Sequence, residues 1–185
     1  SKSDYDALAH IESHAERVYA AMIRSLDRGV GEVLDALRAN NLEENTLVIF
    51  SSDNGAAGYI GGPDPNKPYR GWKMTFFEGG LHSPFFLKWP ARIPKGTRSD
   101  EPVSHIDLFA TAASAAGAPL PSDRSIDGVD LLPYATGDGA GPAHEALFWR
   151  SGGLQVVMAK GWKLQVDERQ KKRWLFHLDT DPTEE

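Results

Sequence analysis

The chain has 185 residues, of which 41% are hydrophobic and 25% charged, a composition typical of a globular protein that buries a sizeable core. The formal net charge of -6 argues against nucleic acid as a partner, because phosphate binding needs a clustered basic surface. Cysteine is absent, which excludes disulfides, zinc thiolates and cysteine nucleophiles within these residues. No apolar run approaches the roughly 20 residues that a membrane helix needs, so no membrane partner is expected.

A long amphipathic helix is predicted at the start of the chain, from Ser3 to about Asn40. Apolar residues recur there at steps of three and four, which is the period of a helix with one apolar face. Ser3 and Asp6 resemble a capping box, and Gly29 and Gly31 are expected to weaken or bend the helix. A short polar loop then leads into a strand, an order typical of α/β folds.

That strand is the most informative part of the sequence. Its apolar run over residues 46–50 ends in two serines followed by Asp53, Asn54 and Gly55. An apolar run without polar alternation is typical of a strand covered on both faces, and open α/β sheets bind ligands just beyond the carboxyl ends of such strands. A carboxylate beside an amide oxygen suits a hard cation such as Ca²⁺ or Mg²⁺. The alternative is a hairpin turn at Asn54-Gly55, but residues 56–63 do not alternate like a return strand.

Residues 56–71 are rich in Gly, Pro and Asn, and they predict a long loop over the strand tip. Lys73 follows this loop, where its ammonium could reach an anionic substrate as a point charge. Composition alone favours an ordinary surface lysine, and Glu-Gly-Gly at residues 78–80 is by itself only a turn signal. Nearby aromatic residues could either line a wall for an apolar substrate group or pack in the core: Trp72, Phe76 and Phe77.

The second half of the chain predicts a strand, a helix and a small sheet. The strand covers residues 85–89 and the helix 106–116, with Asp107 in its first turn for the helix dipole. Turn-rich residues from 119 to 142 mark a candidate boundary, so the expected domains are residues 1–142 and 143–185. Three short strands beyond it predict an antiparallel meander: residues 154–159, 162–166 and 174–178. The basic residues between 160 and 173 are interpreted as a solvated hairpin edge.

Short motifs follow one another along nearly the whole chain in a specific order. They are Ser-Asp-Asn-Gly at 52–55, Gly-Trp-Lys at 71–73, Phe-Glu-Gly-Gly at 77–80, Ser-Pro at 83–84, Trp-Pro at 89–90, Ser-His-Ile-Asp-Leu at 104–108, Ile-Asp-Gly-Val-Asp-Leu at 126–131, Gly-Trp-Lys-Leu at 161–164 and Asp-Pro-Thr-Glu at 181–184. Each motif is weak alone, but the ordered set resembles the C-terminal half of a type I sulfatase of the alkaline phosphatase superfamily. This resemblance implies an α/β fold: part of an alkaline-phosphatase-like sandwich with a mainly buried sheet, followed by a small antiparallel β subdomain.

The resemblance also implies roles for individual residues. Asp53 and Asn54 would complete a Ca²⁺ site, and Lys73 would contact the sulfate group. His82 stands where relatives commonly have arginine, and it is interpreted either as structural or as a substrate contact. The nucleophile of the family is a formylglycine made from a Cys/Ser-x-Pro-x-Arg signature, which this chain does not contain. Formylglycine and the remaining metal ligands are therefore expected in a missing N-terminal half.

The function implied is that of a portion of a sulfatase, with a sulfate ester as substrate and the missing N-terminal half of the same enzyme as partner. One alternative is a phosphodiesterase or phosphonate hydrolase of the same superfamily, whose members tend to carry histidine where Asn54 stands and to prefer transition metals. The other alternative is a non-catalytic binding module, which the absence of the nucleophile would permit.

Overall fold

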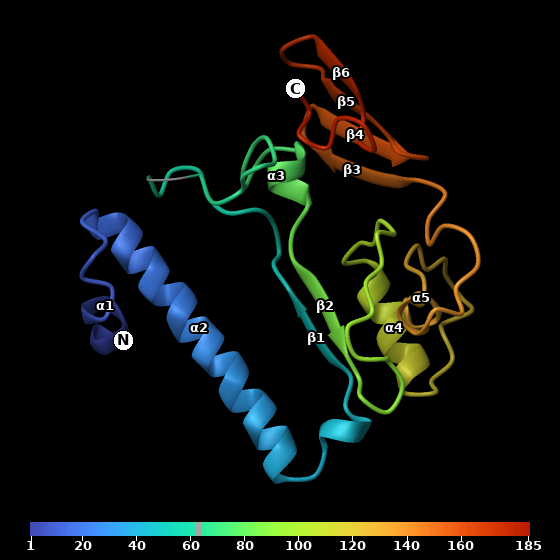
Figure 1. The fold of residues 1–185 in the computed structure, drawn as a ribbon. Helices are drawn as coiled ribbons and strands as arrows, with labels where there is room; N and C mark the ends of the chain where they lie inside the picture. The colour runs from blue at the N-terminus through green and yellow to red at the C-terminus, as the bar shows by residue number, and fades with distance from the viewer. Residues whose placement is uncertain (62–63) are drawn as a thin grey trace. The chain divides into compact units, whose positions relative to one another are not determined.

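The computed structural model describes residues 1–61 and 64–185 (Figure 1). Gly62 and Pro63, at the end of the stretch 56–63, lie outside the described residues. Helices and strands are mixed, as the α/β prediction requires. Among the described helices, none combines the length and the apolar character that crossing a bilayer demands.

The chain forms two compact units. The first contains Ser1–Thr46 and Ser51–Pro84, and the second contains Leu47–Phe50 and Phe85–Glu185. All the residues predicted to bind metal or substrate belong to the first unit.

The first unit begins with two helices, so the prediction of one continuous helix from Ser3 is wrong. Helix α1 spans Lys2–Asp6 and helix α2 spans His14–Ala39 (Figure 1). Each has its own N-cap, because Ser1 accepts from the backbone of α1 and Ser13 accepts from the backbone of α2. The capping box is formed by Ser1 and Asp4 rather than by Ser3 and Asp6.

The second of these helices follows its predicted course. Helix α2 runs through Gly29 and Gly31 without interruption and ends at the C-cap Asn40. A short 3-10 helix, Glu43–Asn45, then leads toward the first strand.

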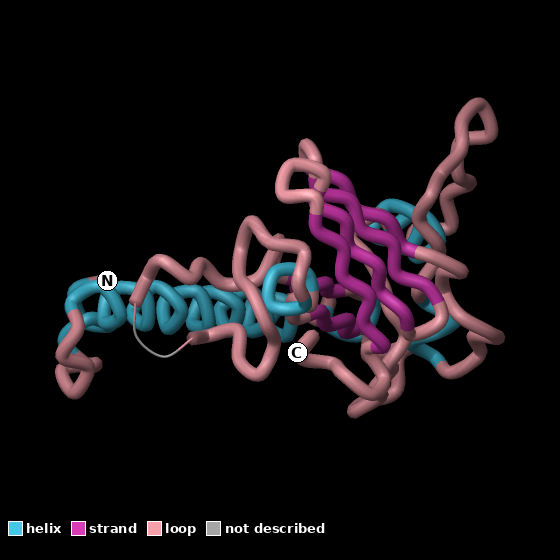
Figure 2. Tube along the Cα trace, turned by 90° about the horizontal axis from the view of Figure 1, so that it is seen from above, coloured by secondary structure: helices cyan, strands magenta, loops and turns pink. Residues whose placement is uncertain are grey.

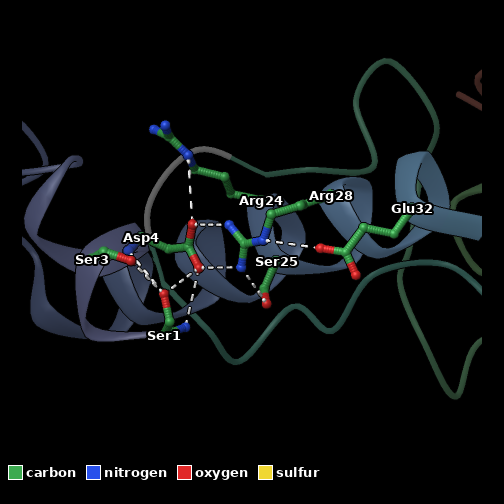
Figure 3. Close-up of polar contacts among 7 residues, drawn as sticks. All are labelled: Ser1, Ser3, Asp4, Arg24, Ser25, Arg28 and Glu32. Atoms are coloured by element: carbon green, nitrogen blue, oxygen red, sulfur yellow. Dashed lines mark hydrogen bonds and ion pairs between the residues drawn. The ribbon is translucent and has the colours of Figure 1, made fainter. Parts of the chain in front are cut away.

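A buried carboxylate connects the two helices (Figure 3). Arg28 of α2 donates two hydrogen bonds to Asp4 of α1, at 2.6 Å and 2.9 Å, and the Ser1 hydroxyl donates a third at 2.7 Å. Arg24 adds a guanidinium 3.7 Å from the same carboxylate. These hydrogen bonds, chiefly those from Arg28, hold the pKa of Asp4 far below its usual range. The negative charge of Asp4 therefore attaches α1 to α2.

The strand that carries the candidate ligands is β1, Val48–Ser51, and it pairs with β2, Phe85–Lys88. Both strands were predicted, although β1 is half-buried along its length rather than covered on both faces by the described residues. The rings of Phe50 and Phe86 meet across the pair with centroids 6.1 Å apart.

The second sheet is an antiparallel meander in the order β3-β4-β5-β6, labelled in Figure 1. Figure 2 shows its strands side by side in magenta. Strands β4, Leu154–Ala159, β5, Trp162–Asp167, and β6, Lys172–His177, confirm the predicted meander. Strand β3, Leu147–Ser151, which pairs with β4, was not predicted from the sequence. The prediction that the basic residues 160–173 form a solvated edge is wrong for Lys163, which is fully buried in β5.

Three further helices complete the described structure. Helix α4, Asp107–Ala115, matches its prediction, whereas α3, Glu78–Leu81, and α5, Leu132–Thr136, lie where only turns were expected. Asp107 does more than complement a helix dipole. Its buried carboxylate accepts from the backbone N–H groups of Ser104 and Val129, at 2.7 Å and 2.9 Å, and lies 2.9 Å from His144 Nε2.

Candidate functional site

The tip of β1 presents two oxygen-bearing side chains. Asp53 is exposed, and Asn54 is half-buried beside it. The amide nitrogen of Asn54 donates to the Gly55 carbonyl at 2.9 Å, and the Ser52 hydroxyl donates to the Asn54 carbonyl at 2.8 Å. Because Asn54 uses its amide nitrogen for the loop, its side-chain oxygen is the atom that remains to bind a cation.

Close backbone contact brings the Glu-Gly-Gly motif against this strand tip. The Gly55 N–H donates to the Gly80 carbonyl at 3.0 Å. A Cβ at Gly55 would lie 1.7 Å from the carbonyl oxygen of Gly79, so only glycine fits at this contact. Two motifs separated in the sequence are therefore adjacent in the first unit.

The Glu-Gly-Gly motif also contacts the loop that carries the lysine. A Cβ at Gly79 would lie 2.3 Å from the Gly71 carbonyl oxygen, and one at Gly80 would lie 2.2 Å from the Thr75 carbonyl oxygen. The Gly79 N–H donates to the Arg70 carbonyl at 2.7 Å. Both glycines of α3 thus permit backbone contacts that any side chain would block.

Lys73 lies in a tight turn formed by residues 72–75. The Thr75 N–H donates to the Trp72 carbonyl at 2.9 Å, and Met74 has a φ of 81°. A positive φ at the third position of such a turn defines type II, in which glycine is the usual residue. The Lys73 N–H donates to the Ala56 carbonyl at 3.1 Å, which joins this turn to the loop after Asp53 and Asn54.

Asn66 is a further residue of the site that the sequence analysis did not single out. Its side-chain oxygen accepts from the Ala56 N–H at 2.7 Å, and its amide nitrogen donates to the Ala56 carbonyl at 3.0 Å. The same carbonyl accepts from Lys73, so Asn66 stabilises the point where the two loops meet. The sequence feature that could have predicted this role is an asparagine in a Gly- and Pro-rich loop, because its side-chain amide can form hydrogen bonds with the backbone as a peptide group does.

His82 follows α3 and contacts two neighbours. Its Nδ1 lies 3.3 Å from Glu78 Oε2, and its ring stacks on Tyr69 with centroids 4.5 Å apart and an interplanar angle of 29°. The side chain remains 54% exposed. The structure thus gives His82 a stacking contact with Tyr69 and a polar contact with Glu78, and its role toward a substrate stays a prediction.

The donor set at the strand tip fits a hard cation in type but not in number. Asp53 and Asn54 supply oxygen atoms only, as Ca²⁺ prefers, while Ca²⁺ takes about six to eight oxygens in proteins. Within residues 1–61 and 64–185, no three His, Cys, Asp or Glu side chains are grouped to hold a metal. Any complete Ca²⁺ site that uses this tip therefore needs oxygens from beyond these side chains.

Comparison with solved structures identifies the fold as that of the alkaline-phosphatase-like sulfatases. Ps i-CgsB, solved in complex with k-i-k-neocarrahexaose, matches with a TM-score of 0.87 and 29% identity, over 100% of this chain and 41% of that chain. A phosphonate monoester hydrolase from Silicibacter pomeroyi matches with a TM-score of 0.70 at 20% identity, over 89% of this chain and 35% of that chain, which shows the shared fold alone.

The sequence comparisons define the family. Residues 2–118 match the family described as Sulfatase, and this chain belongs to that family. It is 42% identical over 138 residues to the steryl-sulfatase of Homo sapiens, covering 71% of this chain and 24% of that protein. It is 46% identical over 122 residues to the N-acetylgalactosamine-6-sulfatase of Canis lupus familiaris, covering 64% of this chain and 23% of that protein. The chain thus spans about a quarter of the length of these relatives.

Proposed function

We propose that this chain forms the C-terminal part of the catalytic domain of a sulfatase that hydrolyses sulfate esters. The observation that carries the proposal is the meeting of three motifs at one place in a member of this family. The strand tip with Asp53 and Asn54, the turn with Lys73 and the glycines of α3 contact one another through backbone atoms. A formylglycine nucleophile belongs to the proposal and would come from outside these residues, since no Cys/Ser-x-Pro-x-Arg signature occurs among them.

Asp53 and Asn54 would bind Ca²⁺ through one carboxylate and one amide oxygen. A bound Ca²⁺ would supply positive charge next to the oxygens of the sulfate group. The Asn54 hydrogen bond to Gly55 turns the amide so that its oxygen can serve as the ligand. Asn54 also distinguishes this site from the histidine-containing alternative, because an amide oxygen suits Ca²⁺ better than a transition metal.

Lys73 would bind the sulfate oxygens and stabilise the negative charge that they carry in the transition state. A well-placed donor in such a position contributes about 2.7 to 4 kcal/mol. The hydrogen bond from the Lys73 N–H to the Ala56 carbonyl supports this role, because it holds the turn that contains Lys73 close to the strand tip. His82 is a weaker candidate for a sulfate contact, since Glu78 and Tyr69 already engage its ring.

The partner in this proposal is the remaining part of the same catalytic domain. Support comes from the apolar side chains of α2, several of which stay exposed although the helix is amphipathic: Val18, Met22, Ile23, Leu26 and Val33. Apolar side chains along one helix face are normally covered. In this proposal the formylglycine nucleophile and the further Ca²⁺ ligands would come from the same partner.

Steady-state kinetics of the complete protein test the proposal. We expect hydrolysis of an aryl sulfate to exceed that of a phosphonate monoester, and Lys73→Ala to lower kcat/KM by roughly 100-fold without a change in melting temperature. Lys95→Ala is the matched control, because Lys95 is an exposed loop lysine in the second unit. Normal kinetics in Lys73→Ala would remove this lysine from the site, and a lower melting temperature would make its role structural.

Calorimetry of the complete protein tests the metal assignment separately from turnover. We expect Asp53→Ala to weaken Ca²⁺ binding, since it removes the charged ligand. Unchanged Ca²⁺ affinity in Asp53→Ala would contradict the assignment whatever the activity of the variant.

A further inference from the structure

Asn54 and Gly55 form a pair in which the backbone can attack the asparagine side chain. Glycine follows asparagine only at this place in the sequence. Because glycine has no Cβ, its nitrogen can approach the side-chain carbon of the preceding asparagine with little steric hindrance. Asparagine is accordingly one of the thermolabile residues of proteins. The tip of β1 therefore combines a candidate metal ligand with a chemically reactive sequence.

The reaction consumes the side-chain amide of Asn54. The Gly55 nitrogen forms a bond to Cγ of Asn54, the bond from Cγ to Nδ2 breaks, and Nδ2 leaves as ammonia with the proton of the Gly55 N–H. Water then opens the cyclic imide at one of its two carbonyl carbons. One product is aspartate. The other is isoaspartate, in which the main chain runs through the former side chain.

The structure holds the attacking nitrogen in a hydrogen bond. The Gly55 N–H donates to the Gly80 carbonyl at 3.0 Å, and Gly55 is buried. A Cβ at Gly55 would lie 1.7 Å from the Gly79 carbonyl oxygen, so the main chain at Gly55 has no room to rotate while α3 is in place. Attack on Asn54 requires the Gly55 nitrogen to lose this hydrogen bond and its proton. The contact with α3 thus opposes the first step of the reaction.

The side chain under attack is held as well. Asn54 Nδ2 donates to the Gly55 carbonyl at 2.9 Å, and the Ser52 hydroxyl donates to the Asn54 main-chain carbonyl at 2.8 Å. The first bond keeps the amide at the carbonyl of Gly55, and the amide must leave it before Cγ can reach the Gly55 nitrogen. Both reacting groups therefore have to give up hydrogen bonds of the folded state.

We propose that Asn54 is a site of spontaneous deamidation, and that the contact between Gly55 and Gly80 keeps it unreactive in the folded protein. Local separation of α3 from the strand tip releases the Gly55 nitrogen. The rate of modification is then the rate in the unfolded chain multiplied by the fraction of molecules in which the contact is open. Isoaspartate lengthens the main chain at the strand tip, so the reaction would remove Asn54 from the Ca²⁺ site irreversibly. Only this last consequence rests on the proposed function.

Peptide mapping by mass spectrometry tests the proposal. The complete protein is incubated in neutral buffer with and without urea, and the peptide that contains Asn54 is analysed for the mass gain of deamidation. We expect modification in the unfolded chain to be on the order of 100-fold faster than in the native protein. Equal rates would overturn the protection, and an unmodified Asn54 in the unfolded chain would overturn the reactive site. Asn54→Gln should abolish the modification in urea, because its longer side chain disfavours the ring.

Gly80→Ala tests which contact protects Asn54. A Cβ at Gly80 would lie 2.2 Å from the Thr75 carbonyl oxygen, so the substitution displaces α3. We expect deamidation of native Gly80→Ala to be at least about tenfold faster than in the unaltered protein. Gly31→Ala is the matched control, because a Cβ there meets nothing within 4 Å. Equal rates in the two variants would overturn the role of Gly80.

Hydrogen exchange of the Gly55 N–H gives a second measurement that needs no variant. Exchange and deamidation both require the bond to Gly80 to open, so both should be slowed by a similar factor relative to the unfolded chain. A Gly55 N–H that exchanges as fast as in the unfolded chain would overturn the proposal. Neither readout depends on turnover or on Ca²⁺, so a failure of the proposed sulfatase function would leave these results unchanged.

Discussion

The ammonium nitrogen of Lys163 lies 2.8 Å from a carboxylate oxygen of Glu184, and both side chains are fully buried. Lys163 comes from β5, and Glu184 comes from the segment that follows β6. Two charges inside a protein lose their hydration, and their mutual attraction offsets that loss only while both are present. The pair therefore attaches the segment after β6 to the middle of the sheet.

Lys163→Met should destabilise the complete protein by about 3 to 5 kcal/mol, because it leaves the Glu184 carboxylate buried without its partner. The free energy of unfolding in denaturant measures this effect. Combining Lys163→Met with Glu184→Leu should recover part of the loss, since no isolated charge remains. Lys172→Met is the control, as Lys172 is exposed on β6 of the same sheet. A loss no larger than that of the control would contradict the structural role of the pair.

Asp4→Asn should weaken the attachment of α1 to α2 in a pH-dependent way. The hydrogen bonds from Arg28 depress the pKa of Asp4 in the folded state. Its contribution to stability is therefore complete well above the unfolded pKa of about 3.9 and is lost as pH falls from there toward the folded pKa. The difference in unfolding free energy between wild type and Asp4→Asn should be larger at pH 7 than at pH 3. A difference that stays constant would show that the charge of Asp4 is not responsible. Asp6→Asn, at an exposed pair with Lys2, is the comparison variant.

Asp107→Ala should cost about 2 to 4 kcal/mol, because the N–H groups of Ser104 and Val129 lose their acceptor and Asp107 is fully buried. Asp107→Asn should cost less, since one oxygen can still accept. Chemical unfolding measures the free energy of unfolding of both variants. Asp127→Ala, at an exposed position, is the control and should stay within about 0.5 kcal/mol of wild type. Equal stability of Asp107→Ala and Asp127→Ala would refute the account.

Asn66→Ala should affect both loops of the candidate site, because the Asn66 side chain makes two hydrogen bonds to Ala56. We expect kcat/KM for a sulfate ester to fall by about tenfold, together with weaker Ca²⁺ binding by calorimetry. Asn66→Asp keeps the accepting oxygen and loses the donor, so its kinetics should be intermediate. A fall in melting temperature with unchanged kcat/KM and Ca²⁺ affinity would make Asn66 purely structural.

The sequence by itself determined the elements that depend on local pattern. The apolar period of α2, the apolar run of β1 and the short strands β4 and β5, which turns separate, all lie close to their predicted positions. These segments are long or strongly patterned, so local preference and final environment agree. The ordered motifs indicated the sulfatase family, because the order of motifs along the chain can be recognised from the sequence without knowing which residues are in contact.

Tertiary structure alone decided what depends on contacts between distant residues. The local sequence predicted Lys163 in a solvated edge, but its buried partner Glu184 lies outside that local sequence, so the pattern around Lys163 could not predict the contact. The glycines at residues 55, 79 and 80 read as turn signals, yet they are required because backbone carbonyls lie where a Cβ would stand. Met74 adopts a left-handed conformation that its residue type disfavours. Two backbone hydrogen bonds hold it there, one from Thr75 to Trp72 and one from Lys73 to Ala56. Long-range backbone hydrogen bonds outweigh local preference at these positions, and they assemble the candidate site.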